Sequence, residues 1–442
     1  MSNIDPADLK RTEVTRKAFD LKFDLIIIGA GPAGLFCAIS SAEPDKKILV
    51  LEKNSFPGRK LLITGSCHCN LTHDGDVQAF LDHYGDHGRF LRSALQSFTN
   101  LDLIAFFEER GLAMIREECG KIFPATMRSK DVLRILTDEL ETGGIGIKCE
   151  QDVKSISRTD EGFTVRCKNR HGEDHIYQSH LLVMATGGMS YPATGSTGDG
   201  YGFIRSLGHD VAEVAPALTP VIVKDPAILD LAGISLSDII ISLFRNRKIK
   251  EVRGDVLFTH QGLSGPGILD LSRFIRAGDT IKLSFAPASE RSALEMWLLQ
   301  KAGQDGSHRL KSVLADLPSY VPLPARLIKW IIERCDIPED LDCAHLTREM
   351  RILLLDHLTG FPLIVSELGG YDIAMVTRGG ASLKDINPKT MQSRLVSGLY
   401  LIGELLDVDG DTGGYNLQAA FSTAKLAARS IKEDWSMRNP PC

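Results

Sequence analysis

The stretch Phe23–Glu52 reads FDLIIIGAGPAGLFCAISSAEPDKKILVLE. An apolar run rich in isoleucine comes first, as expected for a buried strand of a parallel sheet. Gly29 permits a tight turn, Gly31 lets the backbone approach a pyrophosphate, and Gly34 allows the following helix to pack closely on the strand. A second apolar run ends at Glu52, about twenty residues farther on, where a carboxylate accepts ribose hydroxyls. The stretch therefore predicts the strand–turn–helix–strand unit that binds a dinucleotide.

The context of the glycines distinguishes this unit from a glycine-rich turn in an ordinary α/β protein, which is the main alternative. A strand precedes the turn, a helix follows it and a carboxylate ends the next strand, as the motif requires. Glu52, in place of a basic residue, favours an adenosine ribose without a phosphate, as in FAD or NAD. The loop that follows offers Arg59 and Lys60 to neutralise the cofactor phosphates, unless the loop is only a solvated surface.

Composition indicates a globular protein without an evident affinity for nucleic acid or membranes. The 442 residues suffice for two or three domains, and 43% are hydrophobic and 24% charged. The formal net charge is −6 and no basic block stands out, so we expect no nucleic-acid partner. The first residues are polar, and no apolar run is long enough to span a bilayer. Nine cysteines, an odd number in a chain without an export signal, favour free thiols in the cytoplasm.

Changes in sequence texture predict an α/β domain, an antiparallel β-barrel and a helical insert. Strand patterns rich in Ile, Leu and Val occur at 219–223, 237–244, 254–259, 280–285, 360–367 and 372–377. The predicted domains are a polar extension at 1–20, a Rossmann-like nucleotide domain at 21–216 and 378–442, a β-barrel at 217–287 and 359–377, and a helical insert at 288–358. The barrel is thus inserted into the nucleotide domain and itself carries the helical insert.

Within the predicted nucleotide domain, helices and short strands follow the glycine-rich unit. The spacing of apolar residues predicts helices at 101–111 and 129–140, with Ser129 as the N-cap of the second. Alternating residues at 146–167 and 174–182 predict a small antiparallel sheet. We expect its first long strand to place Val153 beside the adenine.

Two later strands end in small residues, which allow a strand to abut a cofactor. The first ends in Ala185-Thr186-Gly187-Gly188, and the second ends in Gly403-Glu404, where the carboxylate suits ribityl hydroxyls. Gly413 and Gly414 then open a helix. The positive end of its dipole would stabilise negative charge on a reduced flavin ring.

The acidic run Asp407–Asp411 suggests a calcium loop, but the rest of the pattern disagrees. Thr412 stands where an EF-hand loop requires glycine, and Gln418 stands where a bidentate glutamate belongs. A buried strand precedes the run instead of a charged helix. The sequence therefore predicts no metal site.

The chain resembles the BaiN-like, aminoacetone-oxidase-type family of FAD-binding oxidoreductases. The matching segments are Gly29–Leu35, Glu52-Lys53, Gly58–Leu62, Cys69–Thr72, Ala185–Pro192, Gly195–Tyr201, Phe258–His260, Gly262–Pro266, Thr377–Gly380 and Gly403–Gln418. The resemblance implies FAD as cofactor, an inserted β-barrel and a helical insert. The predicted cofactor-binding residues are Gly29, Gly31, Pro32, Ala33, Gly34, Glu52, Lys53, Arg59, Lys60, Gly65, Asn70, Val153, Ala185, Thr186, Gly187, Gly188, Gly403, Glu404, Gly413, Gly414, Tyr415, Asn416, Leu417 and Gln418.

No side chain is assigned a catalytic role from sequence, because FAD itself supplies the redox chemistry. Cys67 and Cys69 invite a dithiol hypothesis, although two residues of extended chain separate their Cα atoms by about 6.5 Å, near the limit for a disulfide. His260 follows a predicted strand and suits proton transfer, or else only a hydrogen-bonded turn. Tyr191 lies in a predicted flavin-associated loop.

These features together predict an FAD-dependent oxidoreductase that acts on a small organic substrate by hydride or electron transfer at flavin N5. No second glycine-rich unit follows a strand, so NAD(P)H would bind only transiently as an electron donor. Two alternatives remain: a protein that holds FAD as a structural or sensing ligand, and a flavin-dependent enzyme that modifies RNA. The substrate and the oligomeric state do not follow from the sequence.

Overall fold

The computed structural model describes residues 22–64, 68–286, 289, 291–304, 306–318 and 322–438. The chain divides into two compact units, one formed by Met1–Ala215 with Met375–Cys442 and the other by Pro216–Ala374. Each unit has its own apolar core. No helix of the described residues is long and apolar enough to cross a membrane.

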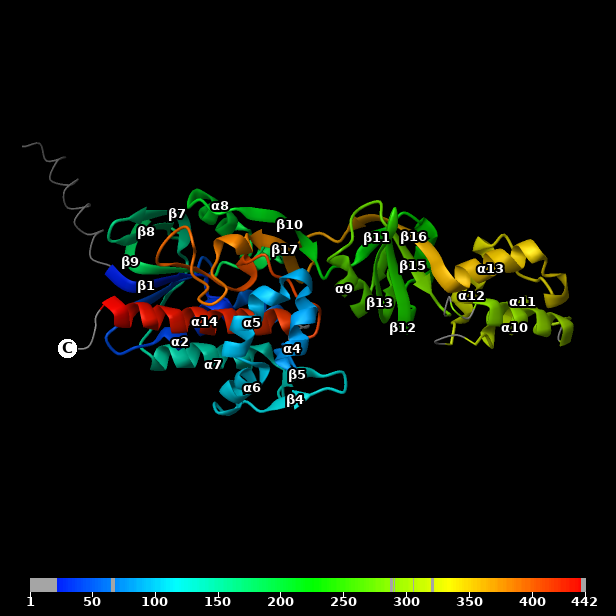
Figure 1. Cartoon of the computed structure of the whole chain (residues 1–442), viewed down its shortest axis with the longest axis horizontal. Helices are drawn as coiled ribbons and strands as arrows, with labels where there is room; N and C mark the ends of the chain where they lie inside the picture. The colour runs from blue at the N-terminus through cyan, green and yellow to red at the C-terminus, as the bar shows by residue number, and fades with distance from the viewer. Residues whose placement is uncertain are drawn as a thin grey trace, which may run out of the picture. The chain divides into compact units, whose positions relative to one another are not determined.

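A seven-stranded sheet forms the centre of the first unit (Figure 1). Its strands are β1 (Lys22–Ile28), β2 (Ile48–Leu51), β6 (Gly146–Lys148), β7 (Asp152–Thr159), β8 (Gly162–Lys168), β9 (Asp174–Met184) and β18 (Leu399–Leu401). The order is β6-β2-β1-β9-β8-β7, and β18 also pairs with β9. Strands β1, β2, β6, β9 and β18 pair in parallel, so their carboxyl ends meet at one edge of the sheet. This is the Rossmann-like α/β fold that the sequence predicts.

Helices from both ends of the chain pack together in the first unit. Helix α2 (Pro32–Ser41) and helix α14 (Tyr415–Arg438) lie next to each other in Figure 1. Phe36 of α2 contacts Phe421 of α14 edge-on, with ring centroids 5.1 Å apart. The same ring contacts Phe98 at 4.9 Å and Phe106 at 5.0 Å. This buried aromatic cluster fixes the start and the end of the chain against one another.

Among its described residues, the first unit contains eleven further α-helices and β-strands. They are α3 (Arg59–Ile63), β3 (Thr72–His73), α4 (Val77–Phe80), α5 (Gly88–Ser97), α6 (Asn100–Glu108), β4 (Met114–Arg116), β5 (Lys121–Pro124), α7 (Ser129–Thr142), α8 (Asp199–Ser206), β10 (Val211–Ala217) and β17 (Val376–Ala381). Strands β3, β5 and β4 form a small sheet, and β10 pairs with β17.

The second unit contains a closed barrel of the strands β11-β14-β13-β12-β15-β16. Their bounds are β11 (Val221–Val223), β12 (Ser235–Arg245), β13 (Arg247–Phe258), β14 (Gly262–Ser264), β15 (Thr280–Ser284) and β16 (Phe361–Leu368). The pairing is antiparallel, so the predicted antiparallel barrel is confirmed. Helix α9 (Pro266–Ser272) follows β14, and α10 (Arg291–Gln304), α11 (Leu310–Ala315), α12 (Ala325–Arg334) and α13 (Arg348–Gly360) lie between β15 and β16 in the chain.

Two local predictions were wrong, and a third is confirmed only in part. Ser129 is the first residue of α7 and not its cap; its hydroxyl donates to the Leu62 carbonyl oxygen at 3.0 Å instead. The antiparallel sheet predicted at 146–167 and 174–182 is confirmed for β7, β8 and β9, but residues 146–148 form β6, which pairs in parallel with β2, and β9 joins these strands to the parallel β1. The predicted barrel strand at 372–377 is absent from the barrel, since β17 pairs with β10. For the two strand predictions, a distant pairing partner determined the result.

Candidate functional site

The glycine-rich turn lies at the carboxyl end of β1, between β1 and α2. Gly29 has a φ of +104°, and a Cβ on it would lie 2.4 Å from the carbonyl oxygen of Ala185. A Cβ on Gly34 would lie 1.9 Å from the carbonyl oxygen of Gly29. A Cβ on Gly31, in contrast, would meet nothing within 4 Å. Two glycines therefore permit close packing, and the third leaves open space over the helix end.

The amino terminus of α2 has no partner from a capping side chain. Gly31 is the N-cap and Pro32 occupies the first turn, which contains no acidic residue. The N–H groups of the first turn, which includes Ala33, have no acceptor within the helix. Together with the positive end of the helix dipole, they suit an anion bound in the open space at Gly31. A pyrophosphate fits this position in charge and in hydrogen-bonding capacity.

Glu52 ends β2 beside the turn and is only 7% exposed. One carboxylate oxygen accepts from the backbone N–H of Ala30 at 2.9 Å. The other accepts from the backbone N–H of Asn54 at 2.9 Å and from its side-chain amide at 2.6 Å. These bonds orient the carboxylate and leave acceptor capacity for ribose hydroxyls. The turn, the helix end and Glu52 thus fit the adenosine half of FAD.

The three basic residues after Glu52 are bonded within the protein. Lys53 pairs with Asp199 at 2.7 Å. Arg59 donates to the Asn54 side-chain oxygen at 3.0 Å. Lys60 pairs with Glu404 at 2.7 Å, and both side chains are about one fifth exposed. Their proposed contact with cofactor phosphates would therefore add to these bonds or exchange with them.

Glu404 is the centre of a polar network that joins distant segments. One oxygen binds Lys60, and the other accepts from the backbone N–H of Thr377 at 2.9 Å and from the Ser190 hydroxyl at 3.0 Å. The Thr377 hydroxyl oxygen in turn accepts from the Met189 backbone N–H at 2.7 Å. A Cβ on Gly188 would lie 2.4 Å from that hydroxyl oxygen. This network holds the segment after β9 against the segment after β18.

The small-residue ends of β9 and β18 lie side by side. The Ala185 N–H donates to the Ile28 carbonyl oxygen at 2.9 Å, and the Ile402 N–H donates to the Met184 carbonyl oxygen at 3.1 Å. Gly403 has a φ of +66°, and a Cβ there would lie 2.9 Å from the Ala33 side chain. Thr186 and Gly187 continue from β9, and the buried Thr186 hydroxyl has no partner among the described residues. The hydroxyl faces α8, because a Cβ on Gly200 would lie 1.9 Å from its oxygen, so it is not exposed to a ligand at this edge.

The start of α14 is held by β3 and its neighbours. Gly413 and Gly414 have φ values of +112° and +94°. The Asn70 side-chain amide has the orientation that satisfies both of its neighbours. In this orientation the amide oxygen accepts from the Gly414 N–H at 3.2 Å, and the amide nitrogen donates to the Thr72 carbonyl oxygen at 2.9 Å. The Asn416 side chain bonds the backbone of Gly410. The helix start is therefore fixed beside the carboxyl edge of the sheet.

Several other predicted site residues have roles within the protein. Gln418 is fully buried, and its amide bonds Thr72, the Phe98 carbonyl oxygen and Ser422. Leu417 is half-buried, and Val153 is buried on β7. Gly65 and Cys67 lie outside the described residues. His260 is exposed between β13 and β14, and Tyr191 has a φ of +53°.

Sequence reasoning missed a cluster of histidines and aspartates at the start of α14. Tyr415 stacks on His83 with ring centroids 4.0 Å apart and on His73 at 5.2 Å. The His83 Nδ1 lies 2.9 Å from an Asp411 carboxylate oxygen. The His87 Nδ1 lies 3.9 Å from Asp407. We call these six residues the His–Asp cluster; because more than 300 residues separate some partners, no local pattern could indicate it.

Burial raises the pKa of Asp407, His87 lowers it and Asp409 raises it, with a net increase. A carboxyl group whose pKa is higher in the folded state binds more protons there than in the unfolded state. It therefore lowers the stability of the fold at pH values above the folded-state pKa. This cost shrinks as the pH falls toward the ordinary pKa of the group. Asp407→Asn is therefore expected to raise the melting temperature at pH 7.5, with a smaller gain at pH 4.5. Thermal unfolding at both pH values checks this; a variant less stable than wild type at pH 7.5 would contradict it.

Burial raises the pKa of the Cys37, Cys69 and Cys167 thiols to about 12, so these groups stay protonated at neutral pH. Cys119 is exposed. We expect a thiol reagent at pH 7.5 to modify Cys119 and to spare the three buried thiols until the protein unfolds. Peptide mapping after labelling, with Cys119→Ser as control, checks this. Labelling of Cys69 in the folded protein would support the dithiol hypothesis instead.

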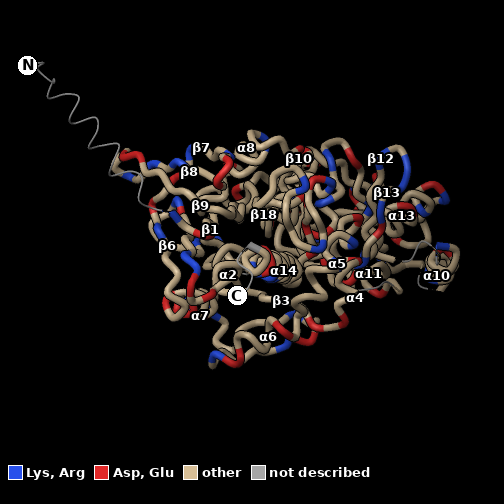
Figure 2. The backbone as a smooth tube through the Cα atoms, turned by 60° about the vertical axis from the view of Figure 1, so that its left-hand side comes forward, with Lys and Arg blue, Asp and Glu red and all other residues tan. Residues whose placement is uncertain are grey.

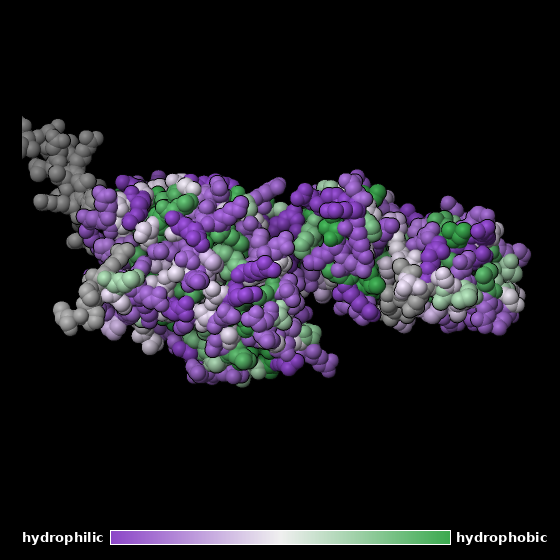
Figure 3. All heavy atoms as spheres, viewed as in Figure 1, coloured by the Kyte–Doolittle hydropathy of each residue, from purple (hydrophilic) through white to green (hydrophobic). Residues whose placement is uncertain are grey.

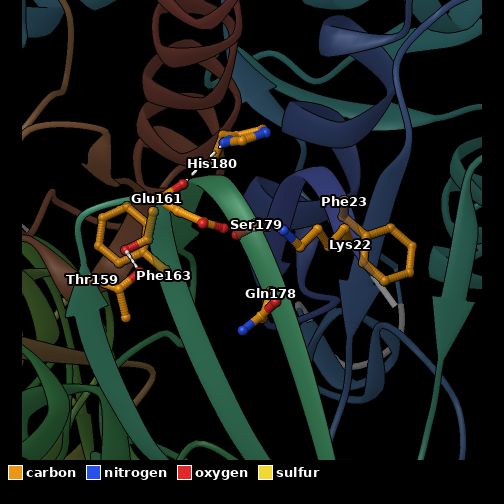
Figure 4. Close-up of a pocket in the computed structure, with 9 residues that line it drawn as sticks. Lys22, Phe23, Thr159, Glu161, Phe163, Gln178, Ser179 and His180 are labelled. Carbon is orange, nitrogen blue, oxygen red and sulfur yellow. Dashed lines mark hydrogen bonds and ion pairs between the residues drawn. The ribbon is translucent and has the colours of Figure 1, made fainter. Parts of the chain in front are cut away.

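The pocket in Figure 4 lies elsewhere on the same unit. Lys22 and Phe23 at the start of β1, Glu161 between β7 and β8, and Ser179 and His180 of β9 line it. Because Lys22 and Ile28 are at opposite ends of β1, this pocket and the glycine-rich turn are about 20 Å apart along the strand. It is not part of the dinucleotide site.

The fold and the site together define a protein of the FAD-binding Rossmann class. The family described as "HI0933-like protein Rossmann domain" matches residues 23–430. The chain belongs to this family of FAD-dependent oxidoreductases, which confirms the resemblance to BaiN-like proteins.

Three comparisons illustrate the relationship. The chain is 31% identical over 414 residues to a "Ribosomal RNA dihydrouridine synthase" of Escherichia coli (strain K12), covering 93% of this chain and 98% of that protein. It is 30% identical over 418 residues to a "3-dehydro-bile acid delta(4,6)-reductase" of Clostridium scindens, covering 92% and 98%. The solved 3-ketosteroid-delta4-(5alpha)-dehydrogenase of Rhodococcus jostii RHA1 has a TM-score of 0.51 at 13% identity, covering 95% and 98%, and so shares the fold.

Proposed function

We propose that the protein is an FAD-dependent reductase of carbon–carbon double bonds conjugated to a carbonyl group. The names of the two relatives carry this proposal. Dihydrouridine is uridine with its ring double bond reduced, and a delta(4,6)-reductase of a 3-dehydro bile acid acts on double bonds conjugated to a ketone. The two substrates differ, but the polarised double bond is common to both. Such a double bond can accept a hydride from a reduced flavin. The reaction needs no nucleophilic side chain, and none is assigned in this chain.

In the proposed mechanism, the glycine-rich turn and the α2 terminus would bind the pyrophosphate of FAD, and Glu52 would orient its ribose. Bound FAD would supply a hydride from N5 once it has been reduced, with NAD(P)H as the proposed donor. The amino terminus of α14, fixed by Asn70 through Gly414, would stabilise negative charge on the ring. The second hydrogen must arrive as a proton, and we place its donor in the His–Asp cluster, with Asp407 and His87 as the proposed pair.

Two substrate classes compete within this proposal. The sequence favours a small organic molecule, because the net charge of −6 offers no general attraction for a polyanion. The E. coli relative's name favours a uracil base in ribosomal RNA. A cytoplasmic location, which the sequence predicts, suits either class.

The test begins with the purified protein, which should be yellow and release FAD on denaturation. The flavin is reduced without oxygen by NADH or NADPH, or by light if neither reacts. A steroidal 4-en-3-one and a uridine-containing RNA transcript are then added separately. Reoxidation of the flavin together with reduced product from either acceptor supports the proposal. A colourless protein that takes up no FAD, or a reduced flavin that neither acceptor reoxidises, would contradict it.

A further inference from the structure

The turn between β12 and β13 concentrates positive charge on the second unit. We define the hairpin cluster as six basic side chains, which belong to Arg245, Arg247, Lys248, Lys250, Arg276 and Lys282. Two carboxylates lie among them, Glu251 and Asp279. Figure 2 shows blue segments along β12 and β13. The cluster thus has four more positive than negative charges.

Strand register brings these residues together. Phe244 of β12 lies opposite Lys248 of β13 and opposite Thr280 of β15. Lys282, two residues along β15, places its ammonium 4.9 Å from the centre of the Phe244 ring. Lys250 places its ammonium 4.0 Å from the centre of the Phe274 ring. Both rings are half-buried, so the cluster combines ammonium groups with partly exposed aromatic surface.

Only part of this charge is neutralised within the protein. Arg245 binds Asp279 through two nitrogens, at 2.8 and 2.7 Å, and Lys248 pairs with Glu251. Among the residues that the structure describes, the charged groups of Arg247, Arg276 and Lys282 form no ion pair within 4.0 Å, and neither does the Lys250 ammonium. These four cations remain available to an external anion.

Cations elsewhere in the second unit are mostly paired. Arg334 binds Asp225, Arg291 binds Asp356, and Arg351 binds Glu295. Lys311 and Lys329 share Glu339. The excess of positive charge is therefore local to the hairpin cluster, and the whole-chain net charge conceals it.

We propose that the hairpin cluster binds the phosphate backbone of RNA, an inference that rests on the proposed function in its RNA form. Several cations on one hairpin can contact successive phosphates, and release of their counterions drives such binding. Arginine and partly exposed aromatic rings suit unpaired bases as well as phosphates.

The test compares two triple variants with the same change in charge. Arg247→Gln/Lys248→Gln/Lys250→Gln removes half of the hairpin cluster. Lys311→Gln/Lys329→Gln/Arg348→Gln removes three cations of α11, α12 and α13 and is the control. Binding of FAD-loaded protein to a fluorescein-labelled 40-nucleotide RNA hairpin with a uridine-rich loop is followed by anisotropy between 50 and 200 mM KCl. Melting temperature and bound flavin confirm that each variant is folded.

The hairpin variant should bind the RNA at least about tenfold more weakly at 100 mM KCl, while the control stays within about twofold. The slope of log affinity against log salt should decrease in magnitude by about two to three, because each lost phosphate contact contributes about 0.7 to 0.9. Equal losses in both variants, or no loss in either, would overturn the proposal. So would equally tight binding of a DNA duplex of the same length, or binding of phosphatidylglycerol vesicles in place of RNA.

The two proposals fail in different ways. Reduction of an acceptor by a protein whose RNA binding is insensitive to the hairpin variant would refute the RNA surface and leave the reductase standing. A protein that binds RNA through the cluster but takes up no flavin would refute the reductase.

Discussion

Gly31→Glu should abolish tight FAD binding while the protein still folds. A Cβ at position 31 meets nothing within 4 Å, so the backbone there can carry a side chain. The carboxylate of the new glutamate, however, would occupy the anion position at the α2 amino terminus. It would accept hydrogen bonds from the N–H groups that the pyrophosphate needs. Losing charge-assisted hydrogen bonds costs about 1.5–3 kcal/mol each, so we expect affinity to fall roughly a hundredfold or more. Titration of the apoprotein with FAD, followed by flavin fluorescence, measures this.

Gly202→Glu is the matched control for that experiment. Gly202 lies on α8 in the same unit, is exposed and also has open space around its Cβ position. The same change in charge and volume there should leave FAD affinity within about twofold, since position 202 belongs to α8 and not to the amino terminus of α2. An equal loss of affinity in both variants would show that added negative charge, and not position 31, is responsible.

Glu404→Ala should destabilise the first unit by about 2–3 kcal/mol. The substitution leaves the half-buried Lys60 ammonium without its carboxylate and the Thr377 N–H without its acceptor. Because both side chains of the ion pair are about one fifth exposed, water compensates part of the loss. Urea unfolding at pH 7.5 measures the change in the free energy of unfolding.

Two further variants separate charge from hydrogen bonding at this position. Glu404→Gln keeps an oxygen for Thr377 and should lose about half as much stability. Adding Lys60→Met to Glu404→Ala should cost less than the sum of the two single substitutions, because the second change removes the uncompensated ammonium. Strict additivity would mean that Lys60 and Glu404 do not stabilise one another.

Local spacing predicted the nucleotide-binding unit well, because its determinants lie within thirty residues. Gly29, Gly34 and Glu52 are close in sequence and in the fold, and their contacts follow from one strand, one turn and one helix. The barrel was also predictable as a class, since its strands alternate in polarity. The strand predicted at 372–377 is not part of it, because β17, which begins at Val376, pairs with β10 instead.

Contacts between distant segments could not be read from spacing. Lys60 and Glu404 are 344 residues apart, and His83 and Asp411 are 328 apart. The basic surface of the barrel has the same origin, because register determines that Lys248 and Lys282 flank Phe244. Individually, these residues look like ordinary surface charges.

Segments near the start and the end of the chain are expected to form a single FAD site. A solved structure of the FAD-loaded protein tests it directly. We expect the pyrophosphate against the backbone of Gly31–Ala33 and the isoalloxazine ring in contact with Gly413–Tyr415. A flavin bound away from either segment would contradict the account.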